Sequence, residues 1–81
     1  MTAWVQVGLK QTVLDPQGKA IQTALARLGY GAIAEVRQAK LFEVRLTAGA
    51  GASEARQQVE RAAREVLTNP VIEDYSISWE E

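Results

Sequence analysis

The chain is centred on the segment Val36-Arg37-Gln38-Ala39-Lys40-Leu41-Phe42-Glu43-Val44-Arg45-Leu46, residues 36–46 of 81. From Phe42 to Leu46, apolar residues alternate with charged ones, which is the period-2 pattern of a half-buried strand. The polar run from Arg37 to Lys40 is short enough to turn one strand into the next, although Ala39 is less permissive than glycine in a turn. The segment therefore predicts a β-hairpin at the middle of the chain.

The half of the chain before this hairpin predicts a strand, a helix and a second strand. Residues Trp4 to Leu9 alternate as a strand does, and Asp15-Pro16 is a helix start in which Asp15 caps free backbone amides. One apolar stripe at helical spacing follows, made of Ala20, Ile21, Ala24, Leu25 and Leu28. Gly29 is a helix stop, and Gly31 to Val36 predicts a short edge strand that leads into the hairpin.

The half after the hairpin predicts one more helix and one more strand. A loop of small residues precedes the helix, with Ala52 or Ser53 as its cap. Its buried stripe comprises Ala55, Val59, Ala62, Ala63, Val66 and Leu67. Asn69-Pro70 ends this helix, because proline disfavours helical geometry in the preceding residue, and Val71 to Trp79 alternates as the last strand.

The predicted order is strand, helix, strand, strand, helix, strand, in a single domain of residues 1–81. This is the ferredoxin-like α+β arrangement of two split βαβ units (βαββαβ), an antiparallel four-stranded sheet in spatial order 4-1-3-2 with both helices on one face. The other face can meet water or pair with another copy. Because so short a chain builds a small core, we expect at least a homodimer, through sheet stacking or strand-edge pairing.

The composition bears on partners and on the cell compartment. A net charge of -1 gives no reason to expect nucleic acid or an anionic membrane as partner. The chain has no cysteine, which excludes disulfides, thiolate metal sites and a cysteine nucleophile. No apolar run approaches the roughly 20 residues of a membrane span, so a soluble, cytoplasmic protein is expected.

Catalysis by the isolated chain is not expected. There is no histidine to act as a general base and no glycine-rich phosphate loop. Glu73 and Asp74 are adjacent in a strand and point to opposite faces, so they cannot act together as an acid and base pair. We also expect no bound metal, since no loop gathers several carboxylates.

Two other functions fit the predicted fold order. RNA recognition needs aromatic residues on the central strands, but Phe42 falls on the core side and the pI of about 5.4 is acidic. A dimeric, ACT-like module that senses a small molecule at the seam of two sheets remains open, although no residue marks a pocket for one.

Three separated segments resemble one protein family. They are Val13-Leu14-Asp15-Pro16-Gln17-Gly18-Lys19-Ala20-Ile21, then Val36-Arg37-Gln38-Ala39-Lys40 with Glu43, and Asn69-Pro70-Val71-Ile72-Glu73-Asp74-Tyr75. In this order they resemble the PurS family, the small subunit of phosphoribosylformylglycinamidine (FGAM) synthase, over almost the whole chain. Ala39 departs from the glycine usual in that family and puts the turn geometry in doubt.

The resemblance implies a supporting role in purine biosynthesis. In that family a glutaminase subunit (PurQ-like) releases ammonia and a large ATP-using synthetase subunit (PurL-like) activates the substrate amide. PurS is dimeric, bridges the two and helps to assemble the ammonia path. This chain would bind no cofactor itself, whereas the complex would use ATP, Mg and glutamine.

The residues expected to contact a partner come from the three resembling segments. They are Asp15, Pro16, Gln17, Gly18, Arg37, Lys40, Glu73, Asp74 and Tyr75. Asp15 to Gly18 lie on a loop, where binding surfaces are common, but they fit a helix cap equally well. Arg37 and Lys40 are suited to acidic groups on a partner, and Tyr75, amphipathic and aromatic, is the best contact anchor. No catalytic residue is expected among them.

Overall fold

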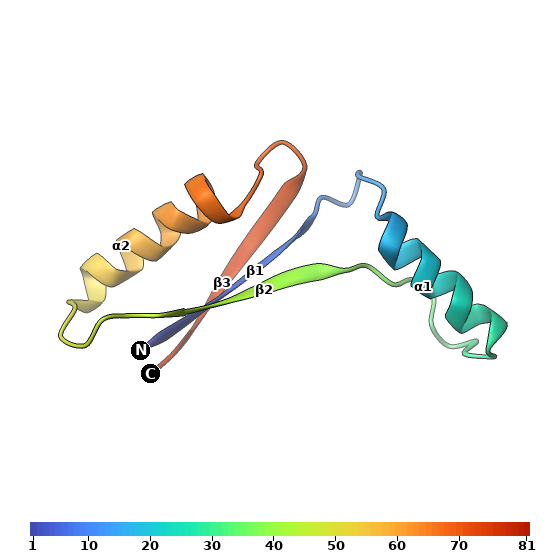
Figure 1. Ribbon diagram of the computed structural model, residues 1–81, viewed down its shortest axis with the longest axis horizontal. Helices are drawn as coiled ribbons and strands as arrows, with labels where there is room; N and C mark the ends of the chain where they lie inside the picture. Colours follow the sequence, from blue (N-terminus) through green and yellow to red (C-terminus); the bar gives the residue numbers. More distant parts are fainter.

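The computed structural model describes all 81 residues as a three-stranded sheet with two α-helices (Figure 1). The elements in chain order are β1 (Thr2–Leu9), α1 (Pro16–Arg27), β2 (Ala39–Arg45), α2 (Ala52–Ala62), a π-helical turn η1 (Ala63–Leu67) and β3 (Glu73–Glu80). The strand order is β2-β1-β3, and both pairs are antiparallel. At the centre of the sheet, Val5 of β1 lies between Phe42 of β2 and Ile77 of β3.

The expectation of a four-stranded ferredoxin-like sheet is wrong. Residues 31–36 form no strand, so the central hairpin does not exist. Two backbone amides of this region are instead bound by side chains near α1, since Val36 N–H donates to Gln22 Oε1 (3.2 Å) and Gln38 N–H donates to Asp15 Oδ2 (2.6 Å). Val36, the last residue of the expected strand, therefore bonds to α1 and not to a neighbouring strand.

The core occupies one face of the sheet. Ala3, Val5 and Val7 of β1 are fully buried against Val59 and Ala63 of the second helical segment. Partly buried apolar residues surround them: Phe42, Val44, Leu46, Leu67, Tyr75, Ile77 and Trp79. The alternation expected along all three strands is therefore confirmed. Only 9 of the 81 residues are buried, so the core of a single chain is small.

The helix boundaries follow local signals closely. Asp15 is the N-cap of α1, with Pro16 at its first position, and the helix runs through Gly18. Gly29 has a positive φ of 95° just beyond the helix, which is the left-handed geometry that ends helices and suits glycine. The cap of α2 is Gly51, which has no capping side chain, so the expectation of Ala52 or Ser53 is wrong by one or two residues.

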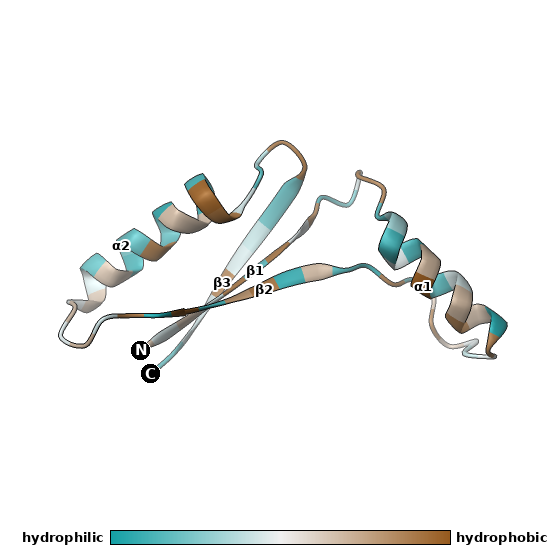
Figure 2. Cartoon of the chain, in the orientation of Figure 1, coloured by the Kyte–Doolittle hydropathy of each residue, from teal (hydrophilic) through white to brown (hydrophobic).

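The two helices lie at opposite ends of an elongated molecule, so they do not share one sheet face as expected (Figure 1). The chain measures 51 × 27 × 14 Å and its radius of gyration is 16.3 Å, whereas a compact chain of this length has roughly 12 Å. Figure 2 shows hydrophobic residues along α1, far from the core. No helix has the length and apolar character needed to cross a membrane.

Candidate functional site

A hydrogen-bonded clamp joins the start of α1 to the segment before β2. Asp15 Oδ1 accepts a hydrogen bond from Gly18 N–H (2.9 Å), and Oδ2 accepts one from Gln38 N–H. The bond from Gln38, followed by that from Gly18, lowers the pKa of the Asp15 carboxyl below its ordinary value. Asp15 is buried, and both of its carboxylate oxygens accept hydrogen bonds from backbone amides of its own chain.

Arg37 belongs to the same clamp. Its guanidinium Nη2 donates to two backbone carbonyls of the loop after β1, that of Val13 (2.8 Å) and that of Lys10 (3.1 Å). Gly18 packs so tightly here that an added Cβ would lie 2.5 Å from the Val36 carbonyl oxygen. Three residues expected to contact a partner, Asp15, Gly18 and Arg37, therefore connect segments of their own chain.

Beside the clamp, a surface hollow gathers four of the expected partner-contact residues. Asp15, Gln17, Lys40 and Glu73 line it with Val7, Gly8, Leu9, Gln38 and Ala39, and its volume is about 260 Å³. Lys40 Nζ lies 3.5 Å from Glu73 Oε2, so the ends of β2 and β3 are linked across β1. The Lys40 side chain is 62% exposed and remains available to another molecule.

The structure separates the other two expected residues of β3 from this hollow. Asp74 forms an ion pair with Lys10 Nζ (2.9 Å), a residue that the sequence patterns did not single out. Tyr75 faces α2 and donates a hydrogen bond from its phenol to Glu60 Oε1 (2.5 Å). That bond raises the pKa of the Tyr75 phenol. The nine residues therefore do not form one contiguous site.

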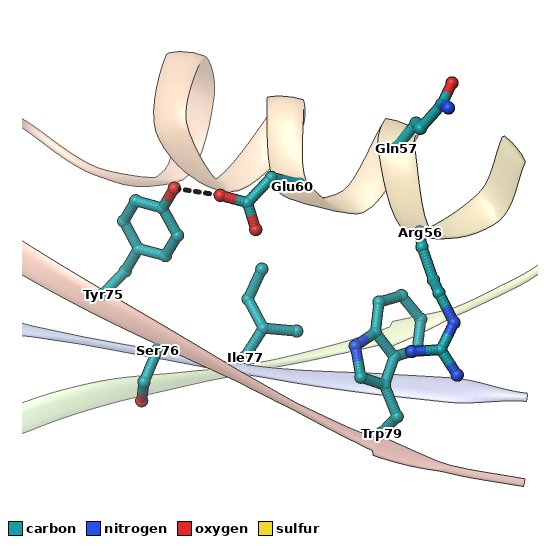
Figure 3. A pocket seen from close by; sticks show the side chains of 7 residues that line it. All are labelled: Arg56, Gln57, Glu60, Tyr75, Ser76, Ile77 and Trp79. Atoms are coloured by element: carbon teal, nitrogen blue, oxygen red, sulfur yellow. Dashed lines mark hydrogen bonds between the residues drawn. The ribbon is translucent and has the colours of Figure 1, made fainter. Parts of the chain in front are cut away.

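The largest hollow lies between α2 and the free edge of β3 (Figure 3). Its volume is about 540 Å³, and its lining residues are Arg56, Gln57, Glu60, Tyr75, Ser76, Ile77 and Trp79. The Arg56 guanidinium lies 5.1 Å from the centre of the Trp79 ring, within cation–π range. The sequence patterns did not predict this hollow. The signal was available in Arg56 and Glu60, four residues apart and facing an aromatic strand.

The side chains that line these hollows are suited to binding. Lys40 and Glu73 form an ion pair, whereas Glu60 and Arg56 contact the aromatic residues of β3. The structure contains no group of three or more His, Cys, Asp or Glu side chains that could hold a metal. Hydrogen bonds and ion pairs hold the strands and loops around these hollows in place. The exposed side chains can therefore bind and position other molecules.

Comparison with known proteins shows the family. The family model for PurS, described as phosphoribosylformylglycinamidine (FGAM) synthase, matches residues 2–81. The chain belongs to the PurS family. The PurS subunit of phosphoribosylformylglycinamidine synthase from Mycobacterium leprae is 44% identical over 78 residues, which cover 96% of this chain and 94% of that relative.

Solved structures of PurS proteins share the fold. The PurS crystal structure from Methanocaldococcus jannaschii superposes with a TM-score of 0.84 at 35% identity, covering 99% of this chain and 95% of that one. A chain of the PurLQS structure from Thermotoga maritima has the same fold, with a TM-score of 0.72 at 24% identity, covering 95% of this chain and 93% of that one. The fold of this chain is therefore shared with solved PurS chains.

Proposed function

We propose that this chain is the non-catalytic small subunit of phosphoribosylformylglycinamidine synthase, a glutamine-dependent ligase of purine biosynthesis. The match of the PurS family model to residues 2–81 carries the proposal, because it covers nearly the whole chain. The residue inventory supports it: a chain without histidine or cysteine lacks the usual nucleophile and base of a glutaminase. Its contribution is to hold the other components in place.

In this role the chain bridges the glutaminase and the ATP-dependent synthetase in the cytoplasm and assists the transfer of ammonia between them. A bridge raises the effective concentration of ammonia at the second active site, which increases the rate without any bond being made by the bridge itself. ATP, Mg and glutamine are used by the other two subunits, and this chain binds no cofactor. The PurLQS structure, whose chain shares this fold, is consistent with a three-component assembly.

The experiment is reconstitution of the purified components. Alone, the chain should show neither glutaminase nor ATPase activity, and adding it to the matching synthetase and glutaminase should raise glutamine-dependent FGAM formation. Ammonia-dependent FGAM formation by the synthetase alone is the control, because it needs no bridge. If the chain leaves the glutamine-dependent rate unchanged, the proposed function is wrong, and saturable binding of a metabolite in calorimetry would then favour a sensor module.

Lys40 offers a test of the hollow beside the clamp as a contact surface. Lys40→Glu should weaken co-elution with the other subunits. Lys40 is the most exposed charged residue of that hollow, and the substitution reverses its charge and breaks its ion pair with Glu73. Arg45→Glu is a matched control, because Arg45 lies on the same strand, is exposed and pairs only with Glu43 (3.2 Å). Equal effects of the two variants would remove this hollow from the interface.

A further inference from the structure

The hydroxyl group of Thr68 is buried without a hydrogen-bond partner in the chain. Thr68 follows η1 and is 8% exposed, and its Oγ1 is the one buried side-chain polar atom that bonds to no other atom of the protein. Its backbone is extended, with a φ of -121° and a ψ of 139°, so the residue lies outside the helical turn whose carbonyls ordinarily accept from a threonine hydroxyl. Buried hydroxyl groups in folded proteins almost always have a partner. A group from outside the chain can therefore supply the missing bond.

Thr68 lines a polar hollow at the end of the sheet where β1 finishes and β3 begins. Its volume is about 310 Å³, and its lining residues are Lys10, Arg64, Thr68, Pro70, Glu73, Asp74 and Tyr75. These residues come from the loop after β1, from η1 and the loop that follows it, and from the start of β3. Groups from three segments of the chain therefore converge around one unpartnered hydroxyl.

The carboxylates of this hollow are already bonded within the chain. Glu73 Oε1 accepts a hydrogen bond from Asn69 N–H (2.8 Å), and Glu73 Oε2 lies 3.5 Å from Lys40 Nζ. Asp74 Oδ1 accepts a hydrogen bond from Lys10 Nζ (2.9 Å). A ligand that offers only donor groups would therefore find few free acceptors here.

Two donors of the hollow are not engaged in this way. One is the Thr68 hydroxyl. The other is the guanidinium of Arg64, which is 56% exposed and lies 3.9 Å from a Glu65 carboxylate that Arg61 already holds at 3.2 Å. Arg64 and Thr68 are four residues apart across η1, and both line the hollow. The free hydrogen-bonding capacity of the hollow therefore calls for a ligand with acceptor oxygens.

Lys10 adds a second cation to the hollow. Its ammonium group pairs with Asp74, whose side chain is 72% exposed, and exposed ion pairs of this kind are weak enough for a stronger anion to replace the carboxylate. Glu60, four residues before Arg64 on the helix, accepts the hydrogen bond of the Tyr75 phenol and lines the other hollow (Figure 3). The site thus offers two cations and one hydroxyl to an anion.

We propose that this hollow binds a phosphate group, as inorganic phosphate or as a phosphate monoester, with Arg64, Thr68 and Lys10 as its donors. A phosphate monoester carries three strong acceptor oxygens and roughly -1.5 to -2 charge at pH 7, which suits donors that converge from separate segments better than a carboxylate does. A guanidinium binds phosphate through two parallel hydrogen bonds, and an ammonium binds it as a point charge. The site goes beyond the proposed function, since it lies within one chain and needs no other subunit.

Amide chemical shifts of the ¹⁵N-labelled full chain test the site directly. Inorganic phosphate, ethyl phosphate and acetate are titrated separately at neutral pH and constant ionic strength. Saturable shifts should be centred on Lys10, residues 64–69 and residues 73–75, with a dissociation constant of roughly 1 mM for at least one of the two phosphates. The ratio of the two phosphate affinities distinguishes the free ion from an ester as ligand. Saturation by neither phosphate, or acetate binding as tightly as phosphate, would overturn the proposal.

Charge substitutions identify the donors. Arg64→Gln should weaken phosphate binding by roughly tenfold, because it removes a charge-assisted pair. Arg27→Gln is the matched control, since Arg27 is an exposed arginine at the end of α1 outside this hollow, and it should leave the affinity within about twofold. Asp74→Asn should tighten binding by roughly threefold, because it frees Lys10 and removes a competing carboxylate. Equal effects of the two arginine variants, or unchanged or weaker binding in Asp74→Asn, would contradict the site.

Thr68→Val tests the hydroxyl itself. Phosphate binding should weaken by roughly threefold or more, whereas the melting temperature in phosphate-free buffer should stay the same or rise, because an unpaired buried hydroxyl costs stability. A lower melting temperature would show that the hydroxyl has a partner within the free chain, and an unchanged affinity would show that phosphate does not bond to it. Either result would refute the proposed site. Both measurements use the isolated chain, so their failure leaves the reconstitution of FGAM formation unaffected.

Discussion

At the scale of single residues, Gly18 lets the start of α1 pack closely against the segment before β2, because it has no Cβ. Gly18→Ala would improve helix propensity by about 0.5–1 kcal/mol, but its Cβ would lie 2.5 Å from both Asp15 Oδ2 and the Val36 carbonyl oxygen. Overpacking costs about 1–3 kcal/mol, so we expect a net loss of about 1–2 kcal/mol in chemical denaturation. Gly31→Ala, with no atom within 4 Å of the new Cβ, should change stability by less than about 0.5 kcal/mol. Equal stability of the two variants would contradict the close packing.

The stability of the clamp depends on pH through the Asp15 carboxylate. Hydrogen bonds from Gln38 and Gly18 lower the pKa of Asp15 in the folded state. The contribution of this carboxylate to the stability of the fold is therefore fully present above the unfolded-state pKa and is lost as pH falls through the folded-state pKa. Asp15→Asn places an amide donor opposite one of the two N–H groups, so its melting temperature at pH 7 should be lower by roughly 4–8 °C.

The difference in melting temperature between the native protein and Asp15→Asn should become smaller as pH falls below about 4, because protonation removes the same acceptor from the native protein. Asp74→Asn is the control, since the Asp74 side chain is 72% exposed in its pair with Lys10 and should shift the melting temperature little. A gap that stays constant from pH 7 to low pH would show that the Asp15 charge plays no part.

At the scale of elements, the continuous helical segment of α2 and η1 has one side that is buried against the sheet and one that is exposed. Val59 of α2 is buried against β1, whereas Val66 of η1 is 77% exposed. Val59→Ala should lower the free energy of unfolding by about 1.5–3 kcal/mol, through lost burial and the cavity left behind. Val66→Ala should cost less than about 0.5 kcal/mol in the same denaturant titration. A larger loss at Val66 than at Val59 would mean that the core lies elsewhere.

At the scale of the whole molecule, a chain with so few buried residues depends on association for much of its stability. If the native protein is a dimer, unfolding includes dissociation, and the melting temperature should rise by several degrees over a roughly 100-fold range of protein concentration. Calorimetry at fixed pH and salt measures this dependence of the melting temperature on protein concentration. A melting temperature independent of concentration in the native protein would indicate a self-sufficient monomer.

How much of this was predictable from sequence differs from residue to residue. The alternation in β1, β2 and β3, the cap at Asp15 and the stop at Gly29 depend on neighbours in sequence, and the structure confirms them. The residues of the clamp were recognised in the sequence, but as expected partner contacts. Their hydrogen bonds within the chain could not be predicted, because Asp15 binds Gln38 and Arg37 binds the loop after β1, both far away in sequence. The hollow between α2 and β3 was missed because its two walls are remote in sequence.

By itself, the sequence determined the family, most of the elements and the inward face of each strand, because periodicity, capping residues and turn chemistry act over a few residues. Only the tertiary structure decided that residues 31–36 do not pair as a strand and that α1 stands away from the sheet. The physical reason is hydrogen bonding between residues remote in sequence: Gln22 accepts from Val36 N–H and Asp15 accepts from Gln38 N–H, and no local pattern announces either bond.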